Sequence, residues 1–191
     1  MIKYKKALDI LKKNKIKIKF ENINSISSIN RISGQNVFSP TNYPAADNTA
    51  FDGYAINSKE TLKTSKKKIK QFKILKTIAA GDNPTINNVP KFSAVEVMTG
   101  AIIQKPFDTV IPIEQINYFP NKNNAKKIII KNEVKKNNHI RFKGSDYRKG
   151  ERVISKGQLI KPSHILAFKT LGINKIKVKK KPKIVFYSTG N

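Results

Sequence analysis

The chain has 191 residues, with 39 Lys and Arg against 12 Asp and Glu, and a net charge of +27 at pH 7. This length suits one large domain or two small ones. The absence of Cys excludes disulfides, thiolate metal sites and cysteine nucleophiles, and the presence of only two His excludes a multi-histidine metal site.

The first 45 residues predict helices followed by extended chain. Residues 4–13 carry an apolar stripe with the i, i+3, i+4, i+7 spacing of an amphipathic helix, formed by Tyr4, Ala7, Leu8 and Leu11. A second, short helix is expected over residues 25–32, ending at Gly34. Pro40 and Pro44 then favour extended chain, because proline fixes its own φ and restricts the residue before it.

The stretch from 47 to 55 carries two carboxylates, Asp47 and Asp52, and an Asp52-Gly53 pair. Asp-Gly between extended segments predicts a tight turn, in which Gly53 takes a positive φ at no steric cost. Such a turn would hold Asp52 at the edge of a rigid element, where catalytic side chains often lie.

From about residue 55 to 140 the pattern changes to short strands separated by turn residues. The predicted strands cover residues 73–79, 94–98, 109–113 and 126–131. Several short strands at this spacing predict a β-rich module or half-barrel. The lysine tract at residues 63–70 is expected to be a solvated loop or edge strand.

The last part of the chain completes a mixed α+β pattern. We expect a strand over 152–154, a helix over 164–171 with Gly172 as its C-cap, and a strand over 176–178. The apolar run at 184–187 has the form of a buried parallel strand, which needs neighbouring strands and a crossover helix. The sequence contains nothing after it that could supply them, so we expect a truncated or split α/β domain.

Three turn-like segments carry groups suited to chemistry. They hold Asp47 and Asp52, Thr99 and Gly100, and Ser145 and Asp146. Each segment alone is ordinary turn chemistry, for which a structural role is the simpler interpretation. A carboxylate and a hydroxyl on separate turns suit the binding of Mg²⁺ or an oxyanion, or the orientation of a water molecule.

In order and spacing, these segments resemble one family. Residues 39–55 are similar to the P-x-x-D-N-S-A-M-D-G-Y-A signature of MoeA, the molybdopterin molybdenumtransferase family that includes the E domain of gephyrin. Five further segments resemble that family in the same order: 98–101 (M-T-G-A), 108–114 ((A/D)-x-V-(V/I)-x-x-E), 141–146 (R-x-x-G-E-D), 169–173 (S-L-G-I) and 186–190 (F-S-T-G). The resemblance covers essentially the whole chain.

The resemblance implies an enzyme of molybdenum cofactor biosynthesis that takes adenylylated molybdopterin and molybdate and releases AMP. By position, Asp52, Thr99 and Asp146 match residues implicated in catalysis and substrate binding, and Gly100 joins the binding set. Asp52 and Asp146 are the implied ligands of Mg²⁺. Asp47 matches a position that shapes the turn.

Four residues depart from the family signature: Ala46 for Phe, Thr49 for Ser, Phe51 for Met and Ser145 for Glu. Thr49 and Phe51 keep the polar and apolar character of those positions. Ser145 removes a charge beside Asp146 and therefore changes the local electrostatics.

The resemblance also implies a division of the chain. A helix within residues 1–19 would pack on an α/β molybdopterin-binding domain, and residues 20–38 with 151–181 would form an αβ linker domain. Residues 39–150 would form an inserted β-rich module, and 182–191 the first strand of the α/β domain. Most of the pterin site would then lie in a missing part. The implied assembly is a homodimer whose site joins the α/β domain of one subunit to the β-rich module of the other.

Two other functions stay open. The chain could be a non-catalytic module that docks on a separate α/β partner, or a lysine-rich nucleic-acid-binding protein. Nucleic-acid binding is the weaker alternative, because only four of the 39 basic residues are Arg and the lysines are spread along the chain. No apolar run approaches the roughly 20 residues that span a bilayer, so we expect a cytoplasmic protein without a membrane partner.

Overall fold

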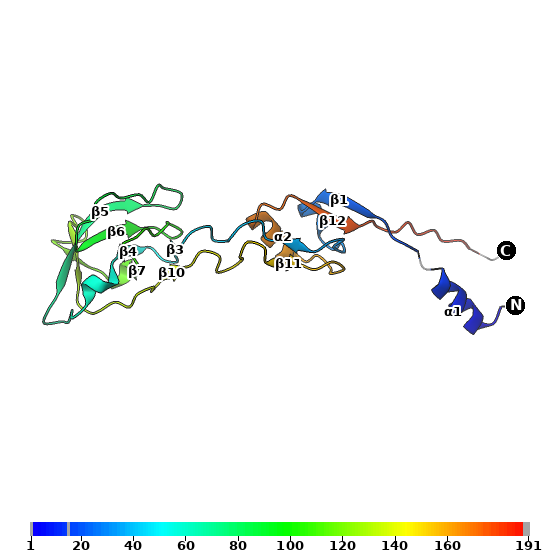
Figure 1. Cartoon of the computed structure of the whole chain (residues 1–191), viewed down its shortest axis with the longest axis horizontal. Helices are drawn as coiled ribbons and strands as arrows, with labels where there is room; N and C mark the ends of the chain where they lie inside the picture. The colour runs from blue at the N-terminus through cyan, green and yellow to red at the C-terminus, as the bar shows by residue number, and fades with distance from the viewer. Residues whose placement is uncertain (1, 15, 189–191) are drawn as a thin grey trace. The chain divides into compact units, whose positions relative to one another are not determined.

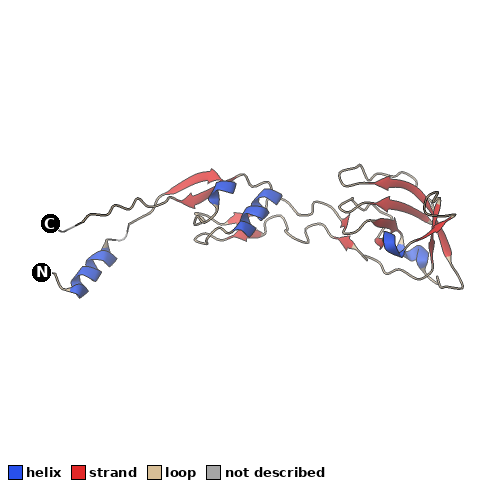
Figure 2. Ribbon diagram, turned by 180° about the vertical axis from the view of Figure 1, so that it is seen from behind, coloured by secondary structure: helices blue, strands red, loops and turns tan. Residues whose placement is uncertain are grey.

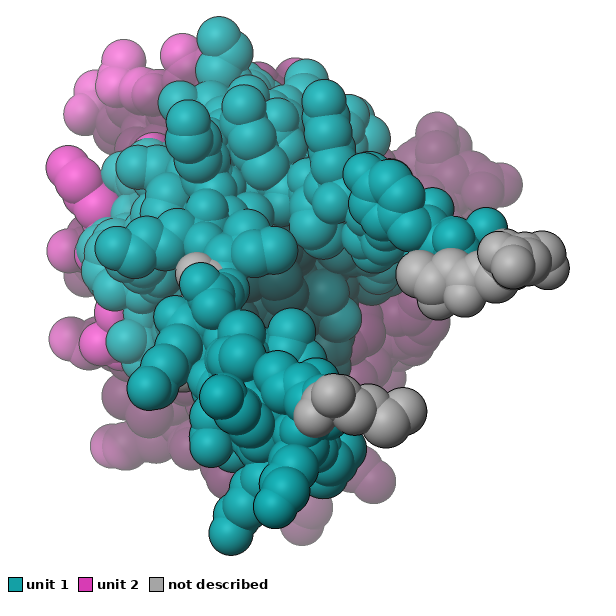
Figure 3. Space-filling model, turned by 90° about the vertical axis from the view of Figure 1, so that its right-hand side faces the viewer, with its two compact units in different colours: residues 1–40, 150–191 teal, residues 41–149 magenta. Residues whose placement is uncertain are grey.

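The structure, a computed structural model, describes residues 2–14 and 16–188. It divides into two compact units, which are coloured separately in Figure 3. Unit 1 is formed by residues 1–40 and 150–191, and unit 2 by residues 41–149. The chain leaves unit 1 and later returns to it, so unit 2 is an insertion within unit 1.

Unit 1 combines two short antiparallel strand pairs with two helices (Figure 1). Its elements are α1 (Tyr4–Lys13), β1 (Phe20–Asn24), the 3-10 turn η1 (Ile26–Ser28), β2 (Val37–Phe38), β11 (Arg152–Ile154), α2 (Pro162–Thr170) and β12 (Lys175–Lys179). β1 pairs with β12, and β2 pairs with β11. The fully buried Phe168 of α2 packs in one cluster with Ile154 and Ile176, so α2 covers both strand pairs.

The predicted helices at 4–13 and 164–171 and the strands at 152–154 and 176–178 are confirmed. The helix predicted over 25–32 is wrong beyond the single turn η1. The backbone beyond that turn bonds to another segment instead, because Asn30 N–H donates to Ile160 O and Ser33 N–H donates to Gln158 O, each at 2.9 Å. The N-terminal part of the chain therefore holds one α-helix and one 3-10 turn among its described residues.

Unit 2 is built on a six-stranded sheet that curls into a half-barrel (Figures 1 and 2), which confirms the predicted β-rich module. Its strands are β4 (Gly53–Ile56), β5 (Lys70–Ile78), β6 (Ser93–Val97), β7 (Thr109–Pro112), β8 (Asn117–Phe119) and β9 (Lys127–Ile130). Their order is β7-β4-β6-β5-β9-β8, with β5 and β6 parallel and the other neighbours antiparallel. Alternate side chains point to opposite faces, so the sheet carries two separate apolar clusters, one around Phe72 and one around Val95.

Four short elements complete unit 2. They are β3 (Asn48–Thr49), β10 (Ile140–Arg141) and the 3-10 turns η2 (Ser58–Thr61) and η3 (Ile113–Gln115). β3 and β10 form a two-stranded antiparallel pair.

The role predicted for Gly53 is wrong. Gly53 has no positive φ and instead begins β4, where it pairs with Val97 of β6 and Pro112 of β7. A Cβ at this position would lie 2.2 Å from the carbonyl oxygen of Ile111. Glycine is required here because the β7 backbone passes too close for any side chain. The bend expected around Asp52 is present, and it ends at the first residue of a strand rather than within a hairpin.

Two apolar segments are uncovered within the described residues. α1 buries none of its residues, and the exposed fraction is 79% for Tyr4 and 70% for Leu11. Residues 184–187, predicted to form a buried strand, form no strand, and all four are exposed, because none of the described strands pairs with them. Thr189 and Gly190 of the F-S-T-G segment lie outside the described part of the chain. None of the described helices is long and apolar enough to cross a membrane.

The close approach at Gly53 predicts a distinctive substitution pattern. Both Gly53→Ala and Gly53→Asn should lower the free energy of unfolding by about 2 kcal/mol or more, because any Cβ collides with the β7 backbone. Gly81, which has φ +92° and open space around its Cβ position, is the control. Gly81→Asn should cost less than about 1 kcal/mol in urea unfolding, because Asn tolerates a positive φ. Equal tolerance of Asn at both positions would contradict this account.

Candidate functional site

The structure joins Asp52 directly to Thr99. Oδ1 of Asp52 accepts a hydrogen bond from the Thr99 backbone N–H at 2.6 Å and a second from the Thr99 hydroxyl at 2.8 Å. Both residues are exposed. The second oxygen, Oδ2, accepts no hydrogen bond from the described residues and is open to a ligand.

Strand register brings this pair together. Gly53 of β4 pairs with Val97 of β6, so the residue before β4 and the residues after β6 meet at the same end of the sheet. Ile113, which follows β7, donates its N–H to Asp52 O at 3.0 Å and fixes the backbone at Asp52. The two halves of the pair are 47 residues apart in sequence.

Two local turns complete the geometry. The Thr49 hydroxyl accepts from the Phe51 N–H at 3.1 Å and holds the bend that leads to Asp52, a function that Ser or Thr can supply. After Thr99 the chain turns through Gly100, which has φ +87° and donates its N–H to Thr49 O at 2.9 Å. Gly100 thus shapes the loop that presents Thr99.

Asp146 belongs to a second pair on the neighbouring loop. Arg141 donates to Asp146 Oδ2 in an ion pair, and its guanidinium lies 5.4 Å from the centroid of the Tyr43 ring. The Asp146 N–H donates to Tyr43 O at 3.0 Å, and the Ser145 hydroxyl lies 3.2 Å from Asp146 Oδ1. Where the resembling family has a charged Glu, Ser145 thus offers a neutral hydrogen-bond donor to Asp146.

β3 links the two pairs. One edge of β3 bonds to the Thr99 loop, because the Thr49 N–H donates to Ala101 O at 3.0 Å and Thr49 O accepts from Gly100. The other edge pairs with β10, where Asn48 lies opposite Arg141. The three segments that the sequence singled out therefore meet around one two-residue strand.

Asp47 belongs to neither pair and instead bonds to the backbone of two neighbouring loops. Its Oδ1 accepts from the Lys143 N–H at 2.8 Å, and its carbonyl oxygen accepts from the Ile103 N–H at 3.0 Å. These bonds connect β3 to the loops on both sides and give Asp47 a structural role.

The hydrogen bonds reinforce the charged forms of Asp52 and Arg141. The backbone N–H of Thr99, followed by its hydroxyl, lowers the pKa of Asp52 below its ordinary value of 3.8. The hydrogen bond to Asp146 raises the pKa of Arg141 above its ordinary value. At neutral pH the site therefore presents one anionic oxygen on Asp52 and a neutralised Arg141–Asp146 pair.

The donor set fits Mg²⁺ at Asp52 better than at Asp146. Mg²⁺ is commonly held by one or two carboxylates together with water and substrate phosphates, and Oδ2 of Asp52 is available for this. Both oxygens of Asp146 have partners in Arg141 and Ser145. The described residues contain no cluster of three or more His, Cys, Asp or Glu that could hold a metal without a substrate.

Sequence reasoning assigned no role to Arg141 or Tyr43. Arg141 could have been singled out, because it is one of only four arginines and lies five residues before Asp146 in a glycine-containing turn. The contact of Tyr43 with Arg141 depends on a fold that brings positions 98 residues apart together, and no local pattern signals it.

The Asp52–Thr99 contact predicts a measurable titration. The Asp52 carboxyl, followed by NMR, should titrate below 3.8, and Thr99→Val should raise its pKa by removing the hydroxyl while keeping the backbone N–H. Because the folded pKa is the lower one, the stabilising contribution is present above pH 3.8 and is lost as the pH falls through the folded pKa. An Asp52 pKa at or above 3.8 in the folded protein would refute the contact.

The chain is similar to proteins of molybdopterin biosynthesis, both in sequence and in structure. The chain is 32% identical over 174 residues to a Haemophilus influenzae protein named molybdopterin molybdenumtransferase, a match that covers 90% of this chain and 40% of that protein. A Staphylococcus aureus protein of the same name is 31% identical over 164 residues, covering 86% of this chain and 38% of its own length. A crystal structure of the Pyrococcus horikoshii OT3 molybdopterin biosynthesis moeA protein superposes with a TM-score of 0.81 at 29% identity.

That structural match covers 95% of this chain and 47% of the Pyrococcus protein, so the chain spans less than half the length of these relatives. Residues 2–172 match the family described as the MoeA N-terminal region (domain I and II). This match takes in all of unit 2, the part of unit 1 before residue 173, and every residue of the Asp52–Thr99 and Arg141–Asp146 pairs. The chain therefore belongs to the MoeA N-terminal region family.

Proposed function

We propose that this chain forms one part of a molybdopterin molybdenumtransferase site, at which molybdate is inserted into adenylylated molybdopterin and AMP is released. The observation that carries the proposal is the Asp52–Thr99 pair. It presents an ionised carboxylate with one oxygen fixed and one oxygen open, in a segment shared with relatives that have this name. A preorganised charge of this kind can act on a substrate without rearranging.

The chemistry follows from the partners of each group. Mg²⁺, when held at Oδ2 of Asp52, would supply positive charge beside the pyrophosphate oxygens of the adenylylated substrate. The Thr99 hydroxyl donates its hydrogen bond to Asp52, so the lone pairs of its oxygen remain available to accept a hydrogen bond from the substrate. Arg141 has five N–H donors and uses only part of them on Asp146, so the remainder can hold an oxyanion such as molybdate.

The proposal extends to assembly and location. Because the chain spans less than half the length of its relatives, we place most of the pterin site on an α/β domain outside residues 1–191. In a protein as long as these relatives, that domain would come from the second subunit of a cytoplasmic homodimer. The net charge of +27 would favour the approach of the anionic substrates.

The chain alone should not complete the transfer. Purified residues 1–191 incubated with adenylylated molybdopterin, molybdate and Mg²⁺ should release no AMP and insert no molybdenum, because the Asp52 side of the site lacks its counterpart. Chromatography of AMP and of the pterin product tests this expectation. Molybdenum insertion by the isolated chain would overturn it.

The role of Asp52 can be tested by supplying the rest of the protein. We suggest fusing this chain to the part of the Haemophilus influenzae relative that it does not cover. Asp52→Asn should lower the rate of AMP release by about tenfold to a hundredfold, because it removes the charge and preserves the shape. Asp82→Asn is the charge-matched control. Asp82 is an exposed carboxylate in the turn after β5, beside the Thr99 loop but outside both pairs, and it accepts the Ala79 N–H at 2.7 Å.

The control fusion should keep the rate of the unsubstituted fusion. Full activity of the Asp52→Asn fusion would remove Asp52 from the proposal. A folded, dimeric fusion that released no AMP would contradict the proposed function as a whole.

A further inference from the structure

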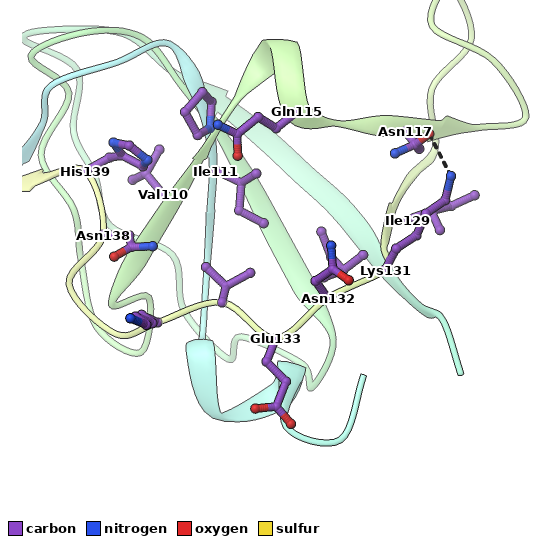
Figure 4. A pocket seen from close by; sticks show the side chains of 14 residues that line it. Val110, Ile111, Gln115, Asn117, Ile129, Lys131, Asn132, Glu133, Asn138 and His139 are labelled. Carbon is purple, nitrogen blue, oxygen red and sulfur yellow. Dashed lines mark hydrogen bonds between the residues drawn. The ribbon is translucent and has the colours of Figure 1, made fainter. Parts of the chain in front are cut away.

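Unit 2 contains a cavity of about 610 Å³ that the proposed function does not use (Figure 4). It lies where the half-barrel is open, because its walls come from both edge strands of the sheet, β7 and β8, together with β9 and residues 131–139. Asp52, Thr99 and Asp146 are not among its lining residues. Its volume is in the range of small-molecule sites, roughly 300 to 1,000 Å³.

The floor of the cavity is apolar. Ile111 and Ile130 line it and are only 6% and 4% exposed, because their remaining surface packs in the cluster around Phe72. Val134 from the crossing segment 131–139 packs on the same cluster. A floor of aliphatic side chains favours a ligand with a flat, weakly hydrated surface such as an aromatic ring.

Amide side chains surround this floor. Figure 4 shows four of them among the lining residues: Gln115, Asn117, Asn132 and Asn138. Each amide can donate and accept hydrogen bonds, which matches the alternating donors and acceptors on the edge of a heteroaromatic base. This concentration of amides favours a nitrogen-rich ring over a hydrocarbon.

The charges in the wall favour an anion. Lys131 and Lys135 line the cavity, and Lys131 Nζ donates to Asn117 Oδ1 at 3.0 Å. The carboxylate among the lining residues, Glu133, accepts the backbone N–H of Lys63 at 2.5 Å. The lysines therefore outnumber the carboxylate, and that carboxylate is already engaged.

We propose that this cavity binds a small phosphorylated heteroaromatic molecule, with its ring over Ile111 and its phosphate beside Lys131 and Lys135. Two sources share this chemistry, a mononucleotide and a phosphorylated pterin. His139 at the rim places its ring 4.8 Å from that of Phe51, the residue before Asp52. A ligand that touches His139 in the cavity is therefore connected to the Asp52 loop through the contact between the His139 and Phe51 rings.

The first experiment measures binding to the intact chain. Isothermal titration with AMP and with 6-hydroxymethylpterin phosphate should show saturable binding of at least one, and the tighter of the two identifies the source. Adenosine and inorganic phosphate should each bind at least tenfold more weakly than AMP, or than the pterin phosphate if that is the ligand. Failure of both phosphorylated compounds to saturate, or phosphate alone binding equally well, would overturn the proposal.

A charge-matched pair of variants locates the site. Lys131→Gln with Lys135→Gln should weaken binding at least tenfold, whereas Lys127→Gln with Lys136→Gln should change it less than twofold. The control removes the same charge from the same segments, and Lys127 Nζ has a similar amide partner in Gln71 at 3.2 Å. Equal weakening by both double variants would mean that the general positive field is responsible and would overturn the proposal.

Asp52→Asn separates this proposal from the proposed function. In Mg²⁺-free buffer, binding in the cavity should be unchanged by that substitution, since Asp52 does not line the cavity and would reach a phosphate only through Mg²⁺. Loss of binding in the Asp52→Asn protein would place the ligand at the Asp52–Thr99 pair and overturn the cavity assignment. A protein that fails this test can still carry the activity proposed above.

Discussion

The close approach of the β7 backbone to Gly53 is the constraint on which the rest of unit 2 depends. With no side chain at Gly53, β4 pairs on both edges, with β6 on one side and β7 on the other. That register places the end of β6 beside the start of β4, and so brings Thr99 to Asp52. Gly53, which is required for steric reasons, thus determines the position of the Asp52 carboxylate.

Hydrogen bonding, rather than burial, tunes the candidate site. Asp52 and Thr99 are exposed, and the fall in the Asp52 pKa comes from two donors on one residue. The Arg141–Asp146 pair is also partly exposed, with side-chain exposures of 39% and 40%, so water screens its attraction and its contribution to stability is small. These pairs therefore serve to position groups, while the apolar clusters on the two faces of the sheet stabilise the unit.

The elements that could be predicted from the sequence are those with a local signal. α1 follows from the spacing of its apolar residues, and β5, β6, β7 and β9 follow from apolar runs between turn residues. β3 and β10 are two residues long and depend on backbone bonds to segments far away in the sequence, so no local pattern reveals them. The function of Gly53 was misjudged for the same reason, because its constraint comes from Ile111, 58 residues later.

The site residues show the same division. Asp52, Thr99 and Asp146 could be selected from a resemblance that extends along the chain, but their partners could not. The ion pair of Asp146 with Arg141 and the hydrogen bonds of Asp47 with the Lys143 loop depend on how β3 and β10 assemble. The sequence motifs therefore identify Asp52 and Asp146 as candidates. Only the fold shows that Asp52 has an open oxygen and that Asp146 is already paired with Arg141.

The central claim is that Asp52 and Thr99 act as one unit in molybdate insertion. A double-mutant cycle on AMP release tests it most directly, made in the fusion with the part of the Haemophilus influenzae relative that this chain does not cover. If Thr99 acts by holding Asp52, Thr99→Val should lower the rate of AMP release in the fusion that keeps Asp52. The same substitution should have little further effect on that rate in the Asp52→Asn fusion. Fully additive effects of the two substitutions would contradict the account.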